Sequence, residues 1–594
     1  MAEVVLFDWA AEPSIGVRVL RRSLIQSGLD AEVIGITREL AQRFRDAPFL
    51  KKETAEKTYR EIIQMLEKHP LMKGTKFFGM TMYDTESAAG PVVELTKRLK
   101  QTHPSLVLIG GGPAFNSSPK AFFSQAKLSY AIRGEAENSF PQLIKALKEG
   151  RQDSVGKIPG IVFRKRSRII VTPPVKLPAE QIINSPLTFA ITGHRANTYT
   201  ERGCSNACIF CGVPRKGVPV AVSDERILES LLELAKDARI KQVDFADDQL
   251  FFNEERTMRL LGKIMAHGLH KRFQFSSLAT IDSFIKSTTI NGEPVKRING
   301  KLIKLIRDAN FRYLEIGTEA LNDNMLKEIK SGRYTAVQAM KVNRALSMAG
   351  ITTHNFLIAG GIHTRSIDFL ESYYRTLVKD LRNLRSSIRY GDMNIMLAQK
   401  NTPVYHEARR EGALFGWTGR PAGKEKGTRI QTWAVVPKDP VLREFILERL
   451  RSGKTHIDGY DLGRVIIMGK ALAQTNPRAA TFVRKLLTVK GNLERLKTQY
   501  DHTYKHFLPR EQVRAFIKRG KRFDKKTLET MPAEEKKELA REIGQEVKNR
   551  VLEHARLVGI ASRRTGIERL RVIQELRRRT GQGMTLLPRR TVKK

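Results

Sequence analysis

The chain has 594 residues, which is more than one hydrophobic core usually supports, so we expect several domains. Its hydrophobic content of 41% excludes a largely disordered protein. The 105 Lys and Arg residues exceed the 62 Asp and Glu residues, giving a formal net charge of +43. This excess indicates either a polyanionic partner, such as a nucleic acid or an anionic membrane surface, or a source whose proteins are generally basic.

Cysteine usage and the start of the chain indicate the compartment. All three cysteines lie between Cys204 and Cys211, whereas a disulfide scaffold needs an even and dispersed set. The first residues lack the basic and apolar segments of a signal peptide, and no run of about 18 uncharged apolar residues could span a membrane. We therefore expect a cytoplasmic protein.

Residues 1–150 alternate between short apolar strands and amphipathic helices. The expected strands are VVLFDW, AEVIGI, FFGMTMYD, LVLIGGG and YAIRGE, and the intervening segments have helical spacing. This alternation predicts an α/β domain with a doubly wound parallel sheet. Ligands of such sheets bind beyond the carboxyl ends of the strands.

A second α/β unit follows a linker. Residues 151–187 contain a hairpin-like sequence and several prolines, which mark a boundary. From 188 to 414 six further strands are expected, around Thr198 and at QVDFAD, FQFSS, YLEIGTE, HNFLIAGG and DMNIMLA. Six βα units predict a partial barrel that is open along one side and has its active site on the loops after the strands. Residues 415–594 are expected to form a basic, mainly helical C-terminal region.

The segment GCSNACIFCG spaces its cysteines as CxxxCxxC on a loop after the first barrel strand. Thiolates this close together can converge on one soft metal site. Zinc requires four ligands, and neither a second cysteine pair nor a neighbouring histidine supplies a fourth. Three ligands on a 4Fe–4S cube would instead leave one iron open for a substrate to chelate.

This loop resembles the signature of the radical S-adenosylmethionine (SAM) superfamily, including its aromatic residue before the last cysteine, here Phe210. The resemblance implies that Cys204, Cys208 and Cys211 hold a 4Fe–4S cluster whose open iron binds the amino and carboxylate groups of SAM. One electron, from a donor such as flavodoxin or ferredoxin, then breaks a carbon–sulfur bond to give methionine and a 5′-deoxyadenosyl radical.

Three later stretches resemble SAM-contacting strands of the same superfamily. At the end of VDFADDQLFF, Asp247, Asp248 and Gln249 are the candidates for polar contacts near the SAM amino group, and in LEIGTEAL the resemblance implies that Glu319 faces SAM. Each of these acids could alternatively be a helix cap or a solvated carboxylate.

The third stretch, NFLIAGGIHT, resembles the fifth-strand segment of the superfamily. The resemblance places Ile358 and Gly360 against the adenine. The usual second glycine is Ala359 here and the usual acidic residue after it is missing, so the chain departs from the pattern at this strand.

The N-terminal unit contains MTMYD, LIGGGPAFNSSP and IRGEAENSF in that order, and it resembles the cobalamin-binding domain that precedes many radical SAM domains. Glycines in its loops would allow a large flat ligand to approach the backbone. The residues that this resemblance places around the corrin are Thr81, Gly110, Gly111, Gly112, Gly134 and Glu135.

One departure concerns the cobalt ligand. The D-x-H-x-x-G motif of many cobalamin domains is absent, and His69 and His103 stand in other contexts. Either cobalt is bound without a protein histidine, or the domain has lost cobalamin and is purely structural.

The absence of further cysteines excludes methylthiotransferases, methyl-cysteine RNA methylases and peptide-modifying relatives with auxiliary clusters. The leading hypothesis is cobalamin-dependent methyl transfer to an unactivated carbon. The alternatives are a cobalamin-free radical rearrangement, cyclisation or carbon–carbon coupling, the modification of a nucleic acid or lipid held by the basic C-terminal region, and a non-catalytic cluster-bearing protein.

Overall fold

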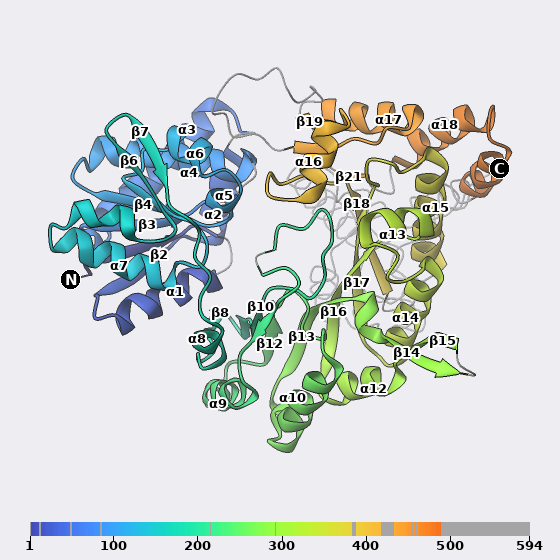
Figure 1. Ribbon diagram of the computed structural model, residues 1–594, viewed down its shortest axis with the longest axis horizontal. Helices are drawn as coiled ribbons and strands as arrows, with labels where there is room; N and C mark the ends of the chain where they lie inside the picture. The colour runs from blue at the N-terminus through green and yellow to red at the C-terminus, as the bar shows by residue number, and fades with distance from the viewer. Residues whose placement is uncertain are drawn as a thin grey trace, which may run out of the picture.

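The computed structural model describes residues 2–10, 14–47, 50–83, 86–213, 215–290, 293–382, 388–416, 433–452, 456–457 and 461–488. Figure 1 shows an N-terminal α/β domain in blue, a central sheet with its helices in green, and a helical layer in orange. None of the helices in the described part of the chain combines the length and the apolar character that crossing a bilayer requires.

The N-terminal domain is built on a sheet with strand order β2-β1-β3-β4-β5-β6-β7. The first five strands pair in parallel, and β6 and β7 add an antiparallel hairpin at one edge. The strands are β1 (Val4–Asp8), β2 (Ala31–Gly35), β3 (Phe77–Thr81), β4 (Val107–Gly111), β5 (Tyr130–Ile132), β6 (Ile161–Lys165) and β7 (Arg168–Val171).

Helices cover both faces of this sheet because its central strands are apolar on both sides, as the fully buried VVLFD of β1 illustrates. α1 (Ile15–Gln26) and α7 (Ala136–Lys148) pack on one face. The other face carries α2 (Arg38–Asp46), α3 (Lys52–Lys68), α4 (Glu86–Thr102) and α6 (Pro119–Gln125). The short α5 (Pro113–Ser117) follows β4 directly.

The second domain is built on a sheet with order β21-β18-β17-β16-β13-β12-β9-β8. Six strands pair in parallel, and antiparallel strands β8 (Ala190–Thr192) and β21 (His456–Ile457) end the sheet, which does not close within the described residues. The parallel strands are β9 (Arg195–Thr198), β12 (Gln242–Phe245), β13 (Gln274–Thr280), β16 (Phe311–Glu319), β17 (Thr352–Ile358) and β18 (Ile388–Asn394).

Helices follow the strands of this partial barrel and cover its outer surface in Figure 1. They are α9 (Asp224–Ala235), α10 (Glu254–Ala266), α11 (Leu269–Arg272), α12 (Gly300–Asp308), α13 (Asp323–Lys330), α14 (Ala336–Met348) and α15 (Ser366–Arg382). α16 (Pro403–Arg410) lies apart from them, beside the helical layer at the top of Figure 1. Three small hairpins branch from the sheet: β10 (Glu201–Arg202) with β11 (Val220–Ala221), β14 (Ile285–Ile290) with β15 (Glu293–Ile298), and β19 (Leu414–Gly416) with β20 (Trp433–Val435).

The fold class expected from the sequence is confirmed: a doubly wound parallel sheet precedes a partial barrel of six parallel strands. The C-terminal helical layer contains α17 (Pro440–Arg451) and α18 (Leu462–Ala473). The remainder of the predicted basic region, residues 489–594, lies outside the described residues.

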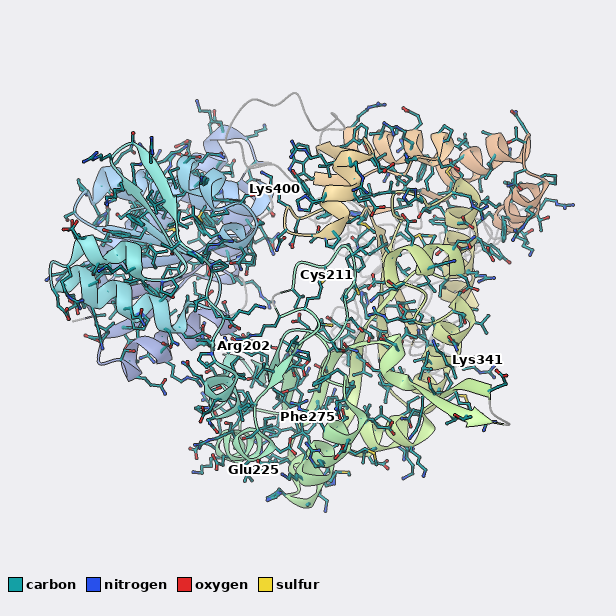
Figure 2. All side chains as sticks on the ribbon, viewed as in Figure 1. Arg202, Cys211, Glu225, Phe275, Lys341 and Lys400 are labelled. Atoms are coloured by element: carbon teal, nitrogen blue, oxygen red, sulfur yellow. The ribbon has the colours of Figure 1, made fainter. Side chains whose placement is uncertain are left out.

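An aromatic stack fills the wall of the barrel. Phe275 on β13, labelled in Figure 2, lies between Phe311 on β16 and Phe245 on β12, with ring centroids 5.3 and 5.6 Å away. All three side chains are buried. Neighbouring parallel strands place these rings side by side, so one hydrophobic contact joins three separate βα units.

We therefore expect Phe275→Ala to destabilise the barrel by about 3–5 kcal/mol, because the surrounding strands cannot collapse into the cavity. The measurement is the shift of the denaturant midpoint of unfolding. The matched control is Leu232→Ala on α9, whose side chain is 41% exposed, and which should change stability by less than about 0.5 kcal/mol. Equal shifts for the two variants would contradict the assignment of this core.

Candidate cluster loop and cofactor site

The cysteine loop leaves the barrel after β9 and runs between the paired strands β10 and β11. Backbone contacts hold its two flanks together. Gly217 N donates to Cys204 O at 2.7 Å, and Cys204 pairs with Lys216 in an isolated parallel β-bridge. Lys216 Nζ donates to the carbonyl of Cys208 at 2.9 Å. The loop is therefore a closed structure that carries all three cysteines.

The three thiols lie close enough to influence one another electrostatically. Burial raises the pKa of Cys204 to about 11, and the neighbouring Cys208 and Cys211 contribute to that rise. Burial also raises the pKa of Cys211, with Cys208 again a neighbour. A metal centre bound here would displace the thiol protons.

Sulfur donors alone are the ligand set that iron–sulfur clusters use, so the residues of this loop fit such a cluster. Within the described parts of the chain, no group of three or more His, Cys, Asp or Glu side chains is arranged to hold a single metal ion. The fit therefore rests on the identity and the loop placement of the three donors.

Two cations from the segment after β16 lie beside Cys208. Arg333 Nη2 donates to Cys208 Sγ at 3.1 Å and is 3.6 Å from Asp282 through its Nε. Lys330, at the end of α13, is buried, lies 3.0 Å from Glu319 Oε1 and is 6.0 Å from the centroid of the Phe210 ring. Burial lowers the pKa of Lys330, but the neighbouring Glu319 carboxylate, the foremost of the groups that oppose burial, turns the net effect into a raised pKa.

The sequence analysis did not identify Lys330 or Arg333, which come from a chain segment far from the cysteines. Basic residues at the end of a helix usually interact with its C-terminal carbonyl groups, so nothing local distinguished these two. They bring two positive charges to the side of the loop where Cys208 lies, and positive charge stabilises thiolate sulfur.

The three candidates after β12 contribute in different ways. Asp247 is 1% exposed and accepts hydrogen bonds from Thr200 N at 2.5 Å, Thr200 Oγ1 at 2.9 Å and Glu201 N at 2.8 Å. It thus fixes the backbone that leads from β9 into the cysteine loop. Burial raises the pKa of the neighbouring Glu201, and repulsion from the Asp247 carboxylate adds to that rise. Of the two acids, Asp247 therefore carries the negative charge.

Gln249 contacts the cysteine loop directly. Its Oε1 accepts from Cys204 Sγ at 3.3 Å and from Ser205 Oγ at 2.9 Å, and its Nε2 donates to Thr280 Oγ1 at 2.9 Å. Asp248 is exposed beside the same loop, where its carboxylate accepts from the backbone N–H of Gly203. The structure therefore brings Asp248 and Gln249, together with Phe210, to the cysteines.

Glu319 ends β16 in a left-handed conformation, with φ of +59°, and is 7% exposed. It reaches the cysteine loop through Lys330, which lies close to Phe210. Ile358 ends β17, and Gly360 begins the loop after it.

A further carboxylate, which the sequence analysis missed, holds that loop. Glu328 on α13 accepts from His363 N and from Thr364 Oγ1, both at 2.8 Å. The chain lacks the acidic residue that the superfamily usually has in this segment, and Glu328 supplies a carboxylate to the same loop from a neighbouring helix.

The candidates of the N-terminal domain gather at the carboxyl ends of β3, β4 and β5. Thr81 ends β3 and its carbonyl accepts from Trp9 Nε1 at 2.9 Å. Gly110 lies against Leu128 so closely that a Cβ on it would be 2.6 Å from Leu128 Cδ1. Gly111 has more room, since a Cβ on it would be 4.0 Å from the nearest atom. Gly112 leads into α5.

Gly134 and Glu135 lie where the two domains meet. Gly134 has φ of +83°, and a Cβ there would lie 2.5 Å from Val175 O, so only glycine fits. Glu135 accepts from Arg215 Nε at 2.8 Å and Arg215 Nη2 at 2.6 Å. Burial would raise the pKa of Glu135, but Arg215, the N–H of Leu177 and Arg202 outweigh burial and lower that pKa.

The candidates thus form two groups, one around the cysteines and one at the carboxyl edge of the N-terminal sheet. Glu135 connects them, because its partner Arg215 belongs to the flank of the cysteine loop. Figure 2 shows Arg202 at the boundary between the domains and Cys211 on the loop that rises beside it.

Two solved structures have a fold similar to that of this chain. A radical SAM methyltransferase, TsrM from Kitasatospora setae, solved with tryptophan substrate and a SAM analogue bound, is 15% identical, with a TM-score of 0.57 over 77% of this chain and 89% of that chain. OxsB, described as a cobalamin-dependent SAM radical enzyme, is 16% identical, with a TM-score of 0.56 over 85% of this chain and 73% of that chain. At these identities the likeness concerns the fold.

Sequence comparison identifies one domain of the chain. A curated relative, an uncharacterized methyltransferase of Pyrococcus horikoshii, is 23% identical over 292 residues, which cover 46% of this chain and 57% of the relative. The chain thus spans little more than half the length of that relative. The family model of the Radical SAM superfamily matches residues 199–373, which include the cysteine loop and the strands from β12 to β17. Residues 199–373 are therefore a radical SAM domain.

Proposed function

We propose that this radical SAM enzyme transfers a methyl group to an unactivated carbon with the help of cobalamin bound to its N-terminal domain. The observation that carries the proposal is the placement of two candidate cofactor sites against each other: the carboxyl end of β5 contacts the cysteine loop through Glu135 and Arg215. TsrM has been solved with cobalamin and a [4Fe–4S] cluster, OxsB is named as cobalamin-dependent, and the curated relative is named a methyltransferase.

In this proposal Cys204, Cys208 and Cys211 hold the 4Fe–4S cluster. When bound, the cluster supplies the electron that breaks a carbon–sulfur bond of SAM, and cobalamin supplies the methyl group. Gln249 holds the loop by accepting from Cys204 and Ser205. The sequence-based assignments of Phe210, Asp248, Glu319, Ile358 and Gly360 to the SAM site remain part of the proposal.

In the N-terminal domain, Thr81, the loop from Gly110 to Gly112, and Gly134 would border the corrin. Two aromatic side chains lie at the same edge: Trp9 follows β1, and the partly exposed Tyr83 follows β3 and packs against it edge to face, with centroids 5.5 Å apart. Trp9 is buried and supports Tyr83, whose 39% exposed ring gives a flat ligand an apolar surface. We propose that the corrin binds there.

The proposed site has no histidine of this domain beside it. His69 follows α3 and precedes β3, and His103 follows α4 and precedes β4, so both lie at the amino ends of the strands. Because the amino and carboxyl ends of parallel strands are on opposite edges of a sheet, neither side chain can reach a ligand at the carboxyl edge. We propose that cobalt is bound without a histidine ligand from the N-terminal domain.

A polyanionic substrate is a second candidate, favoured by the net charge of +43. If the basic C-terminal region holds a nucleic acid, the full chain should bind RNA with an affinity that falls steeply as salt increases. If it holds a lipid substrate, the chain should float with anionic but not with neutral liposomes. Weak, salt-insensitive RNA binding and no flotation would show that the charge reflects general composition.

The cluster assignment is tested by Cys208→Ala. Removing one of three ligands should abolish iron binding after anaerobic reconstitution and, with it, the formation of 5′-deoxyadenosine from SAM. The measurements are iron and sulfide content, the visible spectrum and product analysis. Ser205→Ala, which alters the same loop without removing a thiol, is the matched control and should keep its iron. Continued 5′-deoxyadenosine production by Cys208→Ala would refute the assignment.

The cobalamin assignment is tested by anaerobic incubation with hydroxocobalamin and desalting, which should leave a stoichiometric corrin spectrum. Gly111→Phe should lose that spectrum, because a side chain at this position has room to extend over the carboxyl edge of the sheet and would occupy the corrin site. Gly262→Phe on α10, a position with no atom within 4 Å of its Cβ, is the control. No retained corrin in the unaltered chain would favour cobalamin-free radical chemistry.

A further inference from the structure

Two acidic residues at the start of α7 contact both flanks of the cysteine loop. Glu135 pairs bidentately with Arg215, with N–O distances of 2.8 and 2.6 Å. Glu137 Oε1 lies 2.5 Å from Arg202 Nη2. Arg202 precedes the first cysteine and Arg215 follows the last, so one helix end of the N-terminal domain holds the two ends of the loop. We call these four residues the loop clamp.

The loop clamp is largely shielded from water. The side chain of Arg215 is 8% exposed and that of Glu135 is 12% exposed; those of Arg202 and Glu137 are 19% and 11% exposed. Arg215 Nη2 also donates to the carbonyl of Leu177, whose N–H donates to Glu135 at 2.5 Å. A buried charge that loses its partner is strongly unfavourable, so these contacts fix one arrangement of the domains.

Helix capping does not account for Glu135. An acidic residue at a helix start often accepts a hydrogen bond from the first-turn N–H groups. The Glu135 side chain makes no such capping bond to α7, and both of its oxygens are directed to Arg215 instead. Its carboxylate therefore serves the contact between the domains.

The backbone transmits the position of Arg215 to the first cysteine. Gly203, with φ of +97°, approaches Arg215 so closely that a Cβ on it would lie 2.6 Å from Arg215 O. Cys204 comes next and bridges Lys216, the neighbour of Arg215. A displacement of Arg215 would consequently move Cys204.

We propose that Glu135 and Glu137 are positioning residues for the iron–sulfur cluster. They hold the flanks of the loop so that the three thiolates keep their mutual orientation, and the N-terminal domain thereby controls how firmly the barrel retains its cluster. This role follows from the cysteine loop alone and does not require that cobalamin is bound.

The test uses the full chain, reconstituted anaerobically with iron and sulfide. Glu135→Gln keeps the shape of the side chain and removes its charge. We expect it to release iron to a chelator at least tenfold faster than the unaltered chain, and the electron paramagnetic resonance spectrum of its reduced cluster to change. Arg215→Gln should behave alike, and the double variant should release iron no faster than the worse single variant, because the same contact is already lost.

The matched control is Asn138→Ala, which removes a contact between the same helix and Gln181 in the linker but leaves the loop clamp intact. It should release iron at the rate of the unaltered chain. An unchanged release rate and spectrum in folded Glu135→Gln would overturn the proposal, as would an equal acceleration in Asn138→Ala.

If Glu135→Gln does not fold, Glu137→Gln and Arg202→Lys are measured in the same way. Both variants keep the Glu135–Arg215 pair, and Arg202→Lys also alters the weaker contact between Arg202 and Glu135, 3.6 Å apart. Faster iron release from both supports the proposal. A release rate equal to that of the unaltered chain for both variants would overturn it.

Discussion

Three thiol groups on one loop must be held close together although, once deprotonated, each repels the others. The structure meets this constraint by closing the loop with backbone contacts between Cys204 and the segment at Lys216 and Gly217, and by placing cations around it. Arg333 donates to the sulfur of Cys208, and the buried Lys330 lies near the same residue. A cluster bound by three thiolates would gain from this positive charge, because the reduced form carries more negative charge than the oxidised one.

Side chains that follow the barrel strands hold the cysteine loop through hydrogen bonds. Asp247 accepts three hydrogen bonds from Thr200 and Glu201, and Gln249 contacts Cys204 and Ser205. These two residues, which are two positions apart, therefore act differently: Asp247 orders the backbone that enters the loop, and Gln249 contacts Cys204 itself. Glu328 has a comparable task at β17, where it fixes the loop after Ile358 by accepting from His363 and Thr364.

Ion pairs connect the N-terminal domain to the cysteine loop. Its helix α7 presents Glu135 and Glu137 to Arg215 and Arg202, and the same contact brings the carboxyl edge of the N-terminal sheet next to the cysteine loop. Parallel sheets bind ligands at that edge, so a cofactor on the N-terminal domain would face the part of the barrel where we propose that SAM is cleaved. The ion pairs thus join the cysteine loop to the carboxyl edge of the N-terminal sheet, where the two proposed cofactor sites lie.

The sequence by itself determined the two α/β sheets, the order of their strands along the chain, and the three cysteines, because hydrophobic periodicity and short ligand spacing are local properties. It also predicted that Asp248 and Gln249 lie at the carboxyl end of a strand, because they follow its last residue; their assignment to a SAM site stays a prediction. Only the tertiary structure showed that Glu135 meets Arg215, 80 residues away, and that Arg333 meets Cys208, 125 residues away. In a sequence, a charged residue that stays solvated looks the same as one that forms an ion pair. The two differ only once distant segments dock, exclude water and leave one partner within reach.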